Sequence, residues 1–212
     1  NEEMELTGGK VMRIKELFRG LKAEVSGDDS IEIRGLAYDS RQVRRGDLFF
    51  CLRGLREDGH RFVAHALKRG AVAFLVEKEV RLPKGVALIR VHDSRKALAL
   101  VSARFHDYPS KKLKVIGITG TNGKTTTSYL LRSVYQNAGM KVGVVGTICH
   151  WIGEKSVPGE RTTPESLDLQ RLLARMAKDG VEVAILEVSS HGLSLNRVLG
   201  IDFDFGVFTN IS

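Results

Sequence analysis

The stretch that decides the fold is residues 117–127, which read Gly-Ile-Thr-Gly-Thr-Asn-Gly-Lys-Thr-Thr-Thr. An apolar run over residues 113–118 leads into it, and a pattern typical of a helix follows over residues 128–138. A strand, a glycine-rich turn and a helix N-terminus form a cradle for phosphate, because backbone N–H groups converge on the anion and the helix dipole adds partial positive charge. The sequence therefore predicts a nucleotide site here.

Two side chains in this turn carry the predicted chemistry. Lys124 supplies a full positive charge, and Thr125 directly after it stands where a hydroxyl would hold Mg²⁺. The strict pattern G-x-x-x-x-G-K-[ST] fails by one residue, because its first glycine falls on Ile118. The alternative is an ordinary strand–helix turn with a solvated lysine. Three glycines followed by Lys-Thr-Thr-Thr favour the nucleotide site.

The composition is that of a globular protein. Of the 212 residues, 42% are apolar and 27% are charged, and no apolar run approaches the ~20 residues that cross a bilayer. The N-terminus is acidic and polar, which does not fit a secretory signal. Cys51 and Cys149 lie in apolar surroundings without metal-type or redox-type neighbours, so we expect reduced thiols. These features predict a cytoplasmic protein that does not insert into membranes.

The net charge of +8 fits a protein that handles anionic ligands. Nucleic acid is one such anion, but the Lys and Arg residues are scattered and lack interleaved aromatic residues. We therefore expect no nucleic-acid partner.

Periodicity divides the chain into two halves. In the first, the spacing predicts helices and strands at these positions: helices over 13–22, 61–69 and 94–106, and strands over 31–37, 47–52, 71–76 and 86–91. A polar break with a proline follows at residues 107–112, and the boundary is placed there. The predicted parts are a tail over 1–11, a domain over 12–108 and a second domain over 109–212.

The second half restarts with the strand and the cradle. It continues with a predicted strand over 141–145, a loop through Gly159, a helix over 164–178 and strands over 181–188 and 205–208. Strands that alternate with helices predict parallel sheets. The expected fold class is α/β, with a small first domain followed by the first part of a P-loop-type parallel-sheet ATPase domain. The last predicted strand has no helix after it to cover it, so we expect this domain to be incomplete.

Further candidate residues follow strands of the second half. Glu187 ends a buried strand, and ligands of open α/β sheets gather at the carboxyl ends of strands, where a carboxylate could complete the Mg²⁺ shell begun by Thr125. The alternative is a capping or salt-bridged glutamate. Thr162 and Thr163 precede a helix N-terminus, which is either an anion site or plain N-capping by Thr163. His191 is a lone histidine in a turn, which is more often structural than catalytic.

Together these segments resemble the Mur ligases, which join amino acids to the cytoplasmic precursor of bacterial peptidoglycan. Thr-Gly-Thr-Asn-Gly-Lys-Thr-Thr at 119–126 looks like the family's own variant of the P-loop, which accounts for the missing first glycine. Tyr-Asp-Ser-Arg at 38–41, Gly-Asp-Leu-Phe at 46–49 and the glycines, aspartate and histidine of 54–60 resemble the uridine-binding domain shared by two members, those that add the third residue and the final dipeptide. Thr-Thr-Pro at 162–164 and Glu-Val-Ser-Ser-His-Gly-Leu at 187–193 favour the member that adds the third residue.

The resemblance implies a role for each matching residue. The uridine end would contact Tyr38 and Ser40, and the UDP moiety would contact Leu55, Arg56 and Glu57. The UDP-muramoyl part would bind Thr162, Thr163, Ser189 and Arg197. ATP would bind Gly120, Thr121, Asn122, Gly123, Lys124, Thr125 and Thr126. Thr125 and Glu187 would hold Mg²⁺, with Lys124 and Glu187 as the catalytic residues. The chain departs from some members at Leu195, where they have glutamine, and at Arg161, where they have asparagine.

The resemblance also implies the reaction, the cofactors ATP and Mg²⁺, and the partners. ATP would phosphorylate the D-glutamate side-chain carboxylate of UDP-N-acetylmuramoyl-L-Ala-D-Glu. The amine of the incoming amino acid, diaminopimelate or lysine, would then displace phosphate. The family's carbamylated lysine and its amino-acid-binding domain would lie beyond Ser212. We therefore expect this chain alone to bind nucleotides weakly, to be inactive as a ligase and to be a monomer.

Other functions stay open at this point. The ligase that adds D-alanyl-D-alanine shares the first domain but acts on the UDP-tripeptide. Folylpolyglutamate synthase shares the ATP domain, but residues 31–60 argue against it because it has no uridine domain in front. A non-catalytic nucleotide-binding module is an alternative from a different class. DNA binding by the basic surface is another, which salt-sensitive binding that survives excess ATP would support.

Overall fold

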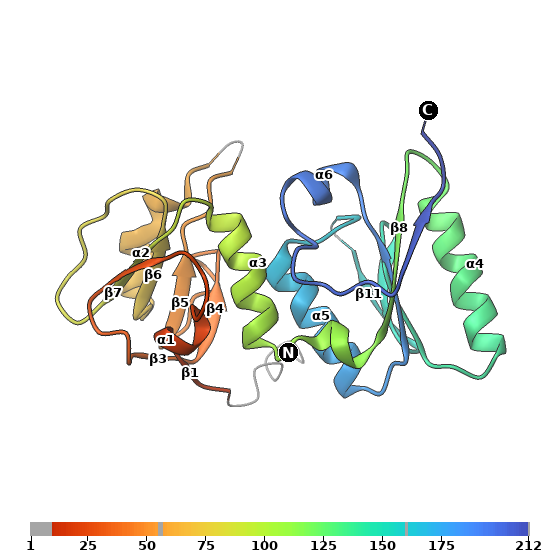
Figure 1. Cartoon of the computed structure of the whole chain (residues 1–212), viewed down its shortest axis with the longest axis horizontal. Coiled ribbons are helices and arrows are strands. Elements are labelled where there is room, and N and C mark those ends of the chain that lie inside the picture. Colours follow the sequence, from red (N-terminus) through yellow and green to blue (C-terminus); the bar gives the residue numbers. More distant parts are fainter. Residues whose placement is uncertain (1–9, 55–56, 160, 212) are drawn as a thin grey trace. The chain divides into compact units, whose positions relative to one another are not determined.

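The computed structural model describes residues 10–54, 57–159 and 161–211. These residues form two compact units, one ending at Phe105 and the other beginning at His106 (Figure 1). Leu55 and Arg56, two predicted contact residues, lie outside the described residues, as do residues 1–9 of the predicted tail. Within the described ranges, no helix is both long and apolar enough to cross a membrane.

The first unit is built on a five-stranded sheet in the order β2-β7-β6-β5-β4. Its strands are β2 (Glu24–Ser26), β4 (Gly35–Ala37), β5 (Asp47–Phe50), β6 (Ala73–Val76) and β7 (Ala87–Arg90). The strands β4 to β7 pair in parallel, and β2 adds an antiparallel edge strand to β7. β5 and β6 are buried along their whole length, as expected for a sheet that is covered on both faces.

Helices provide the cover for this sheet. α2 (Val63–Lys68) follows a 3₁₀ turn (Gly59–Phe62) and packs in one core cluster with Phe49 and Phe74 of the sheet. The two phenylalanine rings meet edge to face, with 5.9 Å between their centroids. α3 (Ser94–Phe105) confirms the helix predicted over residues 94–106.

The prediction for the N-terminal helix was wrong in its length. The helix predicted over residues 13–22 is a single turn, α1 (Ile14–Leu17). The chain then bends through Gly20, whose φ of 76° is left-handed and cannot continue a right-handed helix. β1 (Met12–Arg13) pairs with β3 (Glu32–Ile33), so the strand predicted over residues 31–37 is divided between β3 and β4.

The second unit contains a six-stranded sheet in the order β11-β10-β9-β12-β8-β13. Four strands pair in parallel: β9 (Val142–Val145), β12 (Val183–Glu187), β8 (Lys114–Thr119) and β13 (Phe205–Phe208). β12 lies between β9 and β8, so the carboxyl ends of these three strands meet at one edge of the sheet. Two short turns of helix complete the unit, a 3₁₀ turn at Pro109–Lys112 and α6 at Ser190–Ser194.

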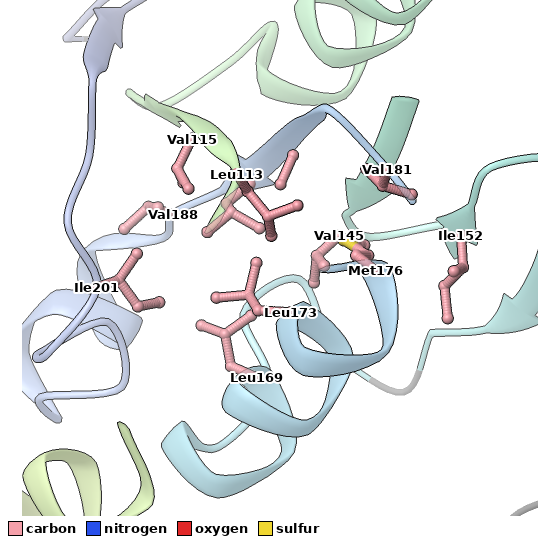
Figure 2. Packing of buried hydrophobic residues seen from close by; sticks show 12 residues of the cluster. Leu113, Val115, Val145, Ile152, Leu169, Leu173, Met176, Val181, Val188 and Ile201 are labelled. Atoms are coloured by element: carbon pink, nitrogen blue, oxygen red, sulfur yellow. The ribbon is translucent and has the colours of Figure 1, made fainter. Parts of the chain in front are cut away.

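Helices α4 (Lys124–Asn137) and α5 (Ser166–Lys178) lie on opposite faces of this sheet (Figure 1). Alternate strand residues point to the two faces, so Ile118 packs in the cluster beneath α4 and Val115 in the cluster with α5. Figure 2 shows Leu173 of α5 directed toward the strand residues of the second cluster. These buried layers fix the sheet edge that carries the candidate site, and the α/β fold class is confirmed.

The loop predicted through Gly159 is wrong in part, because a hairpin forms there. β10 (Cys149–Ile152) pairs antiparallel with both β9 and β11 (Lys155–Pro158). Gly153 takes a φ of 62° in the turn between these strands, which is the left-handed geometry that tight hairpins need. The strands are four residues long, so their alternating pattern was too short to stand out from a loop.

Candidate active site

The predicted phosphate cradle is a tight turn between β8 and α4. Gly120 takes a φ of 132°, and Gly123, the N-cap of α4, takes a φ of 84°. Both values favour glycine. A Cβ on Gly120 would lie 2.1 Å from Oγ1 of Thr209, so a larger residue does not fit there. The backbone geometry therefore explains two of the glycines in the motif.

The turn is fastened to the residues that follow β13. The N–H of Thr121 donates to the backbone O of Asn210 over 3.0 Å, and the N–H of Asn122 donates to Oδ1 of the same residue over 3.1 Å. Oγ1 of Thr209 donates to the backbone O of Asn122 over 2.6 Å. The sequence does not predict this contact, because nothing in an Asn-Ile dipeptide at a strand end indicates that it binds the loop.

Lys124 folds back over the turn. Its Nζ donates to the backbone O of Gly120 over 2.6 Å and to that of Thr121 over 3.0 Å. The ammonium group is thus kept beside the loop backbone, within reach of an anion that enters the cradle. Thr126 is exposed on the first turn of α4. The seven residues predicted to bind ATP therefore lie together, and their role stays a prediction.

Glu187 lies at the end of β12, at the centre of the carboxyl edge. The residue is 1% exposed, and its carboxylate accepts hydrogen bonds from three hydroxyl groups. Oγ1 of Thr125 and Oγ1 of Thr147 each lie 2.9 Å from Oε2 of Glu187. Oγ of Ser128 lies 3.2 Å from Oε1. The structure thus brings Thr125 and Glu187 into contact and adds two hydroxyls that the sequence analysis missed.

Gly146 leaves the room that this carboxylate occupies. A Cβ on Gly146 would lie 2.2 Å from Oε1 of Glu187. The oxygen atoms of Thr125 and Glu187 are hard ligands of the kind that Mg²⁺ prefers, so the donor set fits the predicted metal. Across the described ranges, no group of three or more His, Cys, Asp or Glu side chains forms a metal site. Any further ligands would be water or phosphate oxygens, as is usual for Mg²⁺.

Thr163 joins the end of β12 to the segment after it. It is 2% exposed, and its Oγ1 donates to the backbone O of Glu187 over 2.9 Å and accepts from the N–H of Ser189 over 3.0 Å. Oγ of Ser189 lies 3.2 Å from the same oxygen and accepts from the N–H of Gly192 over 3.0 Å. The alternative of plain N-capping by Thr163 is wrong, because Glu165 is the N-cap of α5.

Arg197 is buried beside the same threonine. Its Nη1 donates to the backbone O of Thr163 over 2.9 Å, and its Nε lies 3.8 Å from Oε2 of Glu165. These two charged residues are 7% and 4% exposed, so their attraction acts in a poorly hydrated environment. Oγ1 of Thr162 lies 2.9 Å from Oγ1 of Thr147. These contacts bring the four residues predicted to bind the UDP-muramoyl part into one network with the carboxyl end of β12.

The described residues predicted to bind the uridine end lie in the first unit. Tyr38 and Ser40 follow β4, and the buried Oγ of Ser40 lies 2.9 Å from Nδ1 of His65. Glu57 is exposed and its carboxylate lies 3.5 Å from Nη1 of Arg61. Because β4 and β5 are parallel, the loops that follow them emerge at the same edge of the sheet.

A hydrogen-bond network that the sequence analysis missed holds the loop after β5. Oδ1 of Asp58 lies 2.5 Å from Nδ1 of His60, and Oδ2 accepts from Nζ of Lys78 over 2.6 Å. Nε2 of His60 accepts from the N–H of Glu77 over 3.2 Å, so the ring proton is on Nδ1 and is donated to Asp58. Burial raises the pKa of Asp58, but the hydrogen bonds from Lys78 and His60 outweigh it and lower the pKa.

The two cysteines and two of the histidines differ in burial. Cys51 and Cys149 are free, as expected, and burial raises the pKa of the Cys51 thiol to about 12. His150 on β10 is buried, and this burial lowers its pKa, with the charge of Glu187 acting in the opposite direction. His191 is exposed in α6.

Two family profiles match the chain, one for each unit. The profile described as the Mur ligase family catalytic domain matches residues 32–106, and the profile described as the Mur ligase middle domain matches residues 118–212. The chain belongs to the Mur ligase family.

Known relatives of this Mur ligase chain are longer than it. A UDP-N-acetylmuramoyl-L-alanyl-D-glutamate–2,6-diaminopimelate ligase of Clostridium perfringens is 44% identical over 202 residues, covering 95% of this chain and 42% of the relative. A solved structure of a ligase with the same name has a TM-score of 0.78 at 28% identity, covering 96% of this chain and 41% of the other. MurF from Acinetobacter baumannii shares the fold, with a TM-score of 0.61 at 24% identity over 86% of this chain and 36% of the other. The chain thus spans less than half the length of these relatives.

Proposed function

We propose that this chain is the uridine-binding and ATP-binding part of a MurE-type ligase, which adds the third amino acid to UDP-N-acetylmuramoyl-L-alanyl-D-glutamate. The contact between Thr125 and Glu187, 2.9 Å long, is the observation that carries the proposal. A hydroxyl directly after the P-loop lysine and a strand-end carboxylate are the protein ligands that Mg²⁺·ATP needs at this edge. The diaminopimelate ligase of Clostridium perfringens supports the choice of substrate.

In the proposed division of labour, residues 12–108 bind the UDP end, residues 109–212 bind ATP, and residues 1–11 are a tail. In the second part, backbone N–H groups of residues 120–126 and the ammonium of Lys124 would bind phosphate oxygens, helped by the dipole of α4. Thr125 and Glu187 would hold Mg²⁺, which when bound neutralises charge on the transferred phosphoryl group.

The substrate would lie on the other side of Glu187. Thr162, Ser189 and Arg197 would contact its muramoyl part, and the buried guanidinium of Arg197 is positioned by Glu165 and by the backbone of Thr163. In the proposed reaction, ATP phosphorylates the D-glutamate side-chain carboxylate, which releases ADP. The amine of the incoming amino acid then displaces phosphate and forms the amide. The relative's name favours 2,6-diaminopimelate as that amino acid.

A calorimetric titration tests the substrate side of this proposal. The 212-residue chain is titrated with UDP-N-acetylmuramoyl-L-Ala-D-Glu, with UDP-N-acetylglucosamine as the control that keeps the uridine and lacks the peptide. Selective binding of the muramoyl dipeptide is the expected result. Binding of Mg²⁺·ATP by a folded chain that binds no UDP-sugar would contradict the assignment of the first unit.

Activity needs the full-length protein that contains this chain. ADP release is measured with the UDP-dipeptide and diaminopimelate, with lysine in place of diaminopimelate, and with the UDP-tripeptide and D-alanyl-D-alanine. We expect turnover with the UDP-dipeptide and diaminopimelate. Turnover with the UDP-tripeptide instead would favour a MurF-type ligase, and the absence of turnover with every pair would favour a non-catalytic module.

A further inference from the structure

Hydroxyl groups surround Glu187, and each of them has one proton to donate. A carboxylate and a backbone carbonyl can only accept hydrogen bonds. A hydroxyl with one of these groups as its acceptor, and with another hydroxyl as its other side-chain partner, therefore directs its proton to that group. Because its proton is then used, such a hydroxyl can only accept in its contact with a second hydroxyl, and the second hydroxyl must be the donor.

The first chain of hydroxyls ends at the carboxylate. Oγ1 of Thr147 lies 2.9 Å from Oε2 of Glu187, so the proton of Thr147 is donated to the carboxylate. The same Oγ1 lies 2.9 Å from Oγ1 of Thr162. Since Thr147 has no second hydroxyl proton, Thr162 is the donor in this contact. Oγ1 of Thr162 then has only lone pairs left for a ligand.

The second chain ends at the backbone carbonyl of Glu187. Oγ1 of Thr163 donates to this oxygen over 2.9 Å, so Oγ of Ser189, 3.2 Å away, must donate to Thr163. Thr163 also accepts from the N–H of Ser189. Its proton and both of its lone pairs are then used within the protein. Ser189 accepts from the N–H of Gly192 and has one lone pair left.

We infer that Glu187 polarises this side of the site, so that Thr162 and Ser189 accept hydrogen bonds from the substrate and donate none. Thr147 and Thr163 are positioning residues that set this polarity, and the hydroxyl of Thr163 does not touch the substrate.

The inference rests on the proposed function for the identity of the ligand, and it says which of the ligand's groups go where. The peptide N–H and sugar O–H groups of UDP-N-acetylmuramoyl-L-Ala-D-Glu are donors that fit an accepting surface. Its phosphates and carboxylates would be repelled by lone pairs. They are left to the backbone N–H groups and to Arg197.

The first series of hydroxyls, from Thr162 through Thr147 to Glu187, is tested by a double-mutant cycle in urea on the protein without ligand. The variants are Thr147→Val, Thr162→Val and the double variant, with Thr147→Ser as the control that keeps the hydroxyl. Each variant is compared by the factor by which it raises the unfolding constant. If Thr162 donates to Thr147, the factor for the double variant should be smaller than the product of the two single-variant factors by about threefold or more. Thr147→Ser should stay within about twofold of the wild type. Single effects that simply multiply would overturn the inference.

The consequence for the substrate is tested by titrating the same proteins with UDP-N-acetylmuramoyl-L-Ala-D-Glu. Thr147→Val keeps Thr162 but releases its proton, so we expect affinity to fall by about three- to tenfold. Thr147→Ser should restore it. The double variant should bind no more weakly than Thr162→Val alone. Wild-type affinity in Thr147→Val would overturn the inference.

The second chain is tested at Thr163. Thr163→Ser keeps the hydroxyl and should bind the dipeptide within about twofold of the wild type. Thr163→Val should bind it at least about threefold more weakly, although this hydroxyl does not touch the substrate. Equal affinities of the two variants would overturn the positioning role.

Failure of the proposed function gives a different pattern. If the wild-type chain does not bind the dipeptide, the proposed substrate is wrong. The cycle in the ligand-free chain still decides whether Thr147 and Thr162 are coupled. If Thr147 and Thr162 are coupled, the hydrogen bond between them is supported whatever the ligand is. If they are not coupled, that hydrogen bond is ruled out whatever the ligand is.

Discussion

The hydroxyl of Thr125 lies 2.9 Å from the carboxylate of Glu187, although the two residues are 62 positions apart in the sequence. The order of strands in the sheet makes this contact. β12 pairs in parallel with β8, so Glu187 at the end of β12 lies beside the first turn of α4, which follows β8 in the sequence. The contact joins the turn that would bind phosphate to the residues that would bind the second substrate. Its geometry leads to testable consequences in the neighbouring residues.

Gly146→Ala should displace the carboxylate of Glu187. The new Cβ would lie 2.2 Å from Oε1, so the side chain has to move from its hydroxyl partners. We expect a loss of about 1–3 kcal/mol in the free energy of unfolding, measured in urea. Titration should also show at least about tenfold weaker binding of Mg²⁺·ATP, because a metal ligand is misplaced. Gly206→Ala is the matched control, since a Cβ there meets no atom of the described residues within 4 Å. Equal behaviour of the two variants would contradict the geometry.

Lys124→Ala should remove the charge that faces the phosphates. We expect nucleotide affinity of the chain to fall by about tenfold or more, and turnover of the full-length ligase to be abolished. Lys155→Ala, which changes an exposed lysine of β11, should leave both unchanged. Retained activity in Lys124→Ala would show that the P-loop assignment is wrong.

Glu165→Ala should remove the carboxylate that lies 3.8 Å from Nε of the buried Arg197. Breaking a buried pair costs about 3–5 kcal/mol, and denaturant unfolding would measure the loss. The matched control is Asp179→Ala, which breaks an ion pair of similar length, 3.7 Å, with Arg175 at the C-terminal end of α5. That pair is 23% and 36% exposed, so its loss should cost about 0–1 kcal/mol. Similar losses of unfolding free energy in the two variants would contradict the claim that the Glu165–Arg197 pair is the less hydrated of the two.

The stability of the chain should depend on pH through His150. Burial lowers the pKa of His150 in the folded chain below its usual 6.5, so the unfolded chain binds more protons as the pH falls below 6.5. The free energy of unfolding should therefore decrease from pH 7 toward the lowered pKa. His150→Gln should reduce this decrease, whereas His191→Gln, at an exposed position, should not. An unchanged pH profile in His150→Gln would disprove the effect.

The sequence predicts the cradle and the strand that precedes it because few arrangements accommodate glycine, lysine and threonine at this spacing. Glu187 could be predicted for a similar reason, since a carboxylate at the end of an apolar strand has to find a partner. Ser128 and Thr147 could not, because hydroxyl residues are common on helices and in loops and their contacts with Glu187 depend on the order of strands in the sheet.

The wrong predictions of helices and strands also have causes that the sequence pattern does not show. α1 ends after one turn although its apolar residues continue at helical spacing, because Gly20 takes a left-handed conformation that periodicity does not report. The hairpin of β10 and β11 was missed because short strands leave too few alternations to count. In the first unit, the pairing of Asp58 with Lys78 joins residues from two loops, and only the folded chain brings them together.

The attachment of the P-loop to Asn210 has a practical consequence for anyone who trims this protein. Asn210 lies 88 positions after Asn122, well outside the motif by which the loop is known. A shortened protein that ends at Phe208 would still contain every residue of that motif. It would lack the backbone carbonyl of Asn210 that binds Thr121, and the side-chain amide of Asn210 and hydroxyl of Thr209 that bind Asn122. The smallest piece that preserves the shape of the loop is therefore defined by the neighbouring strand, and cloning by motif alone would cut it too short.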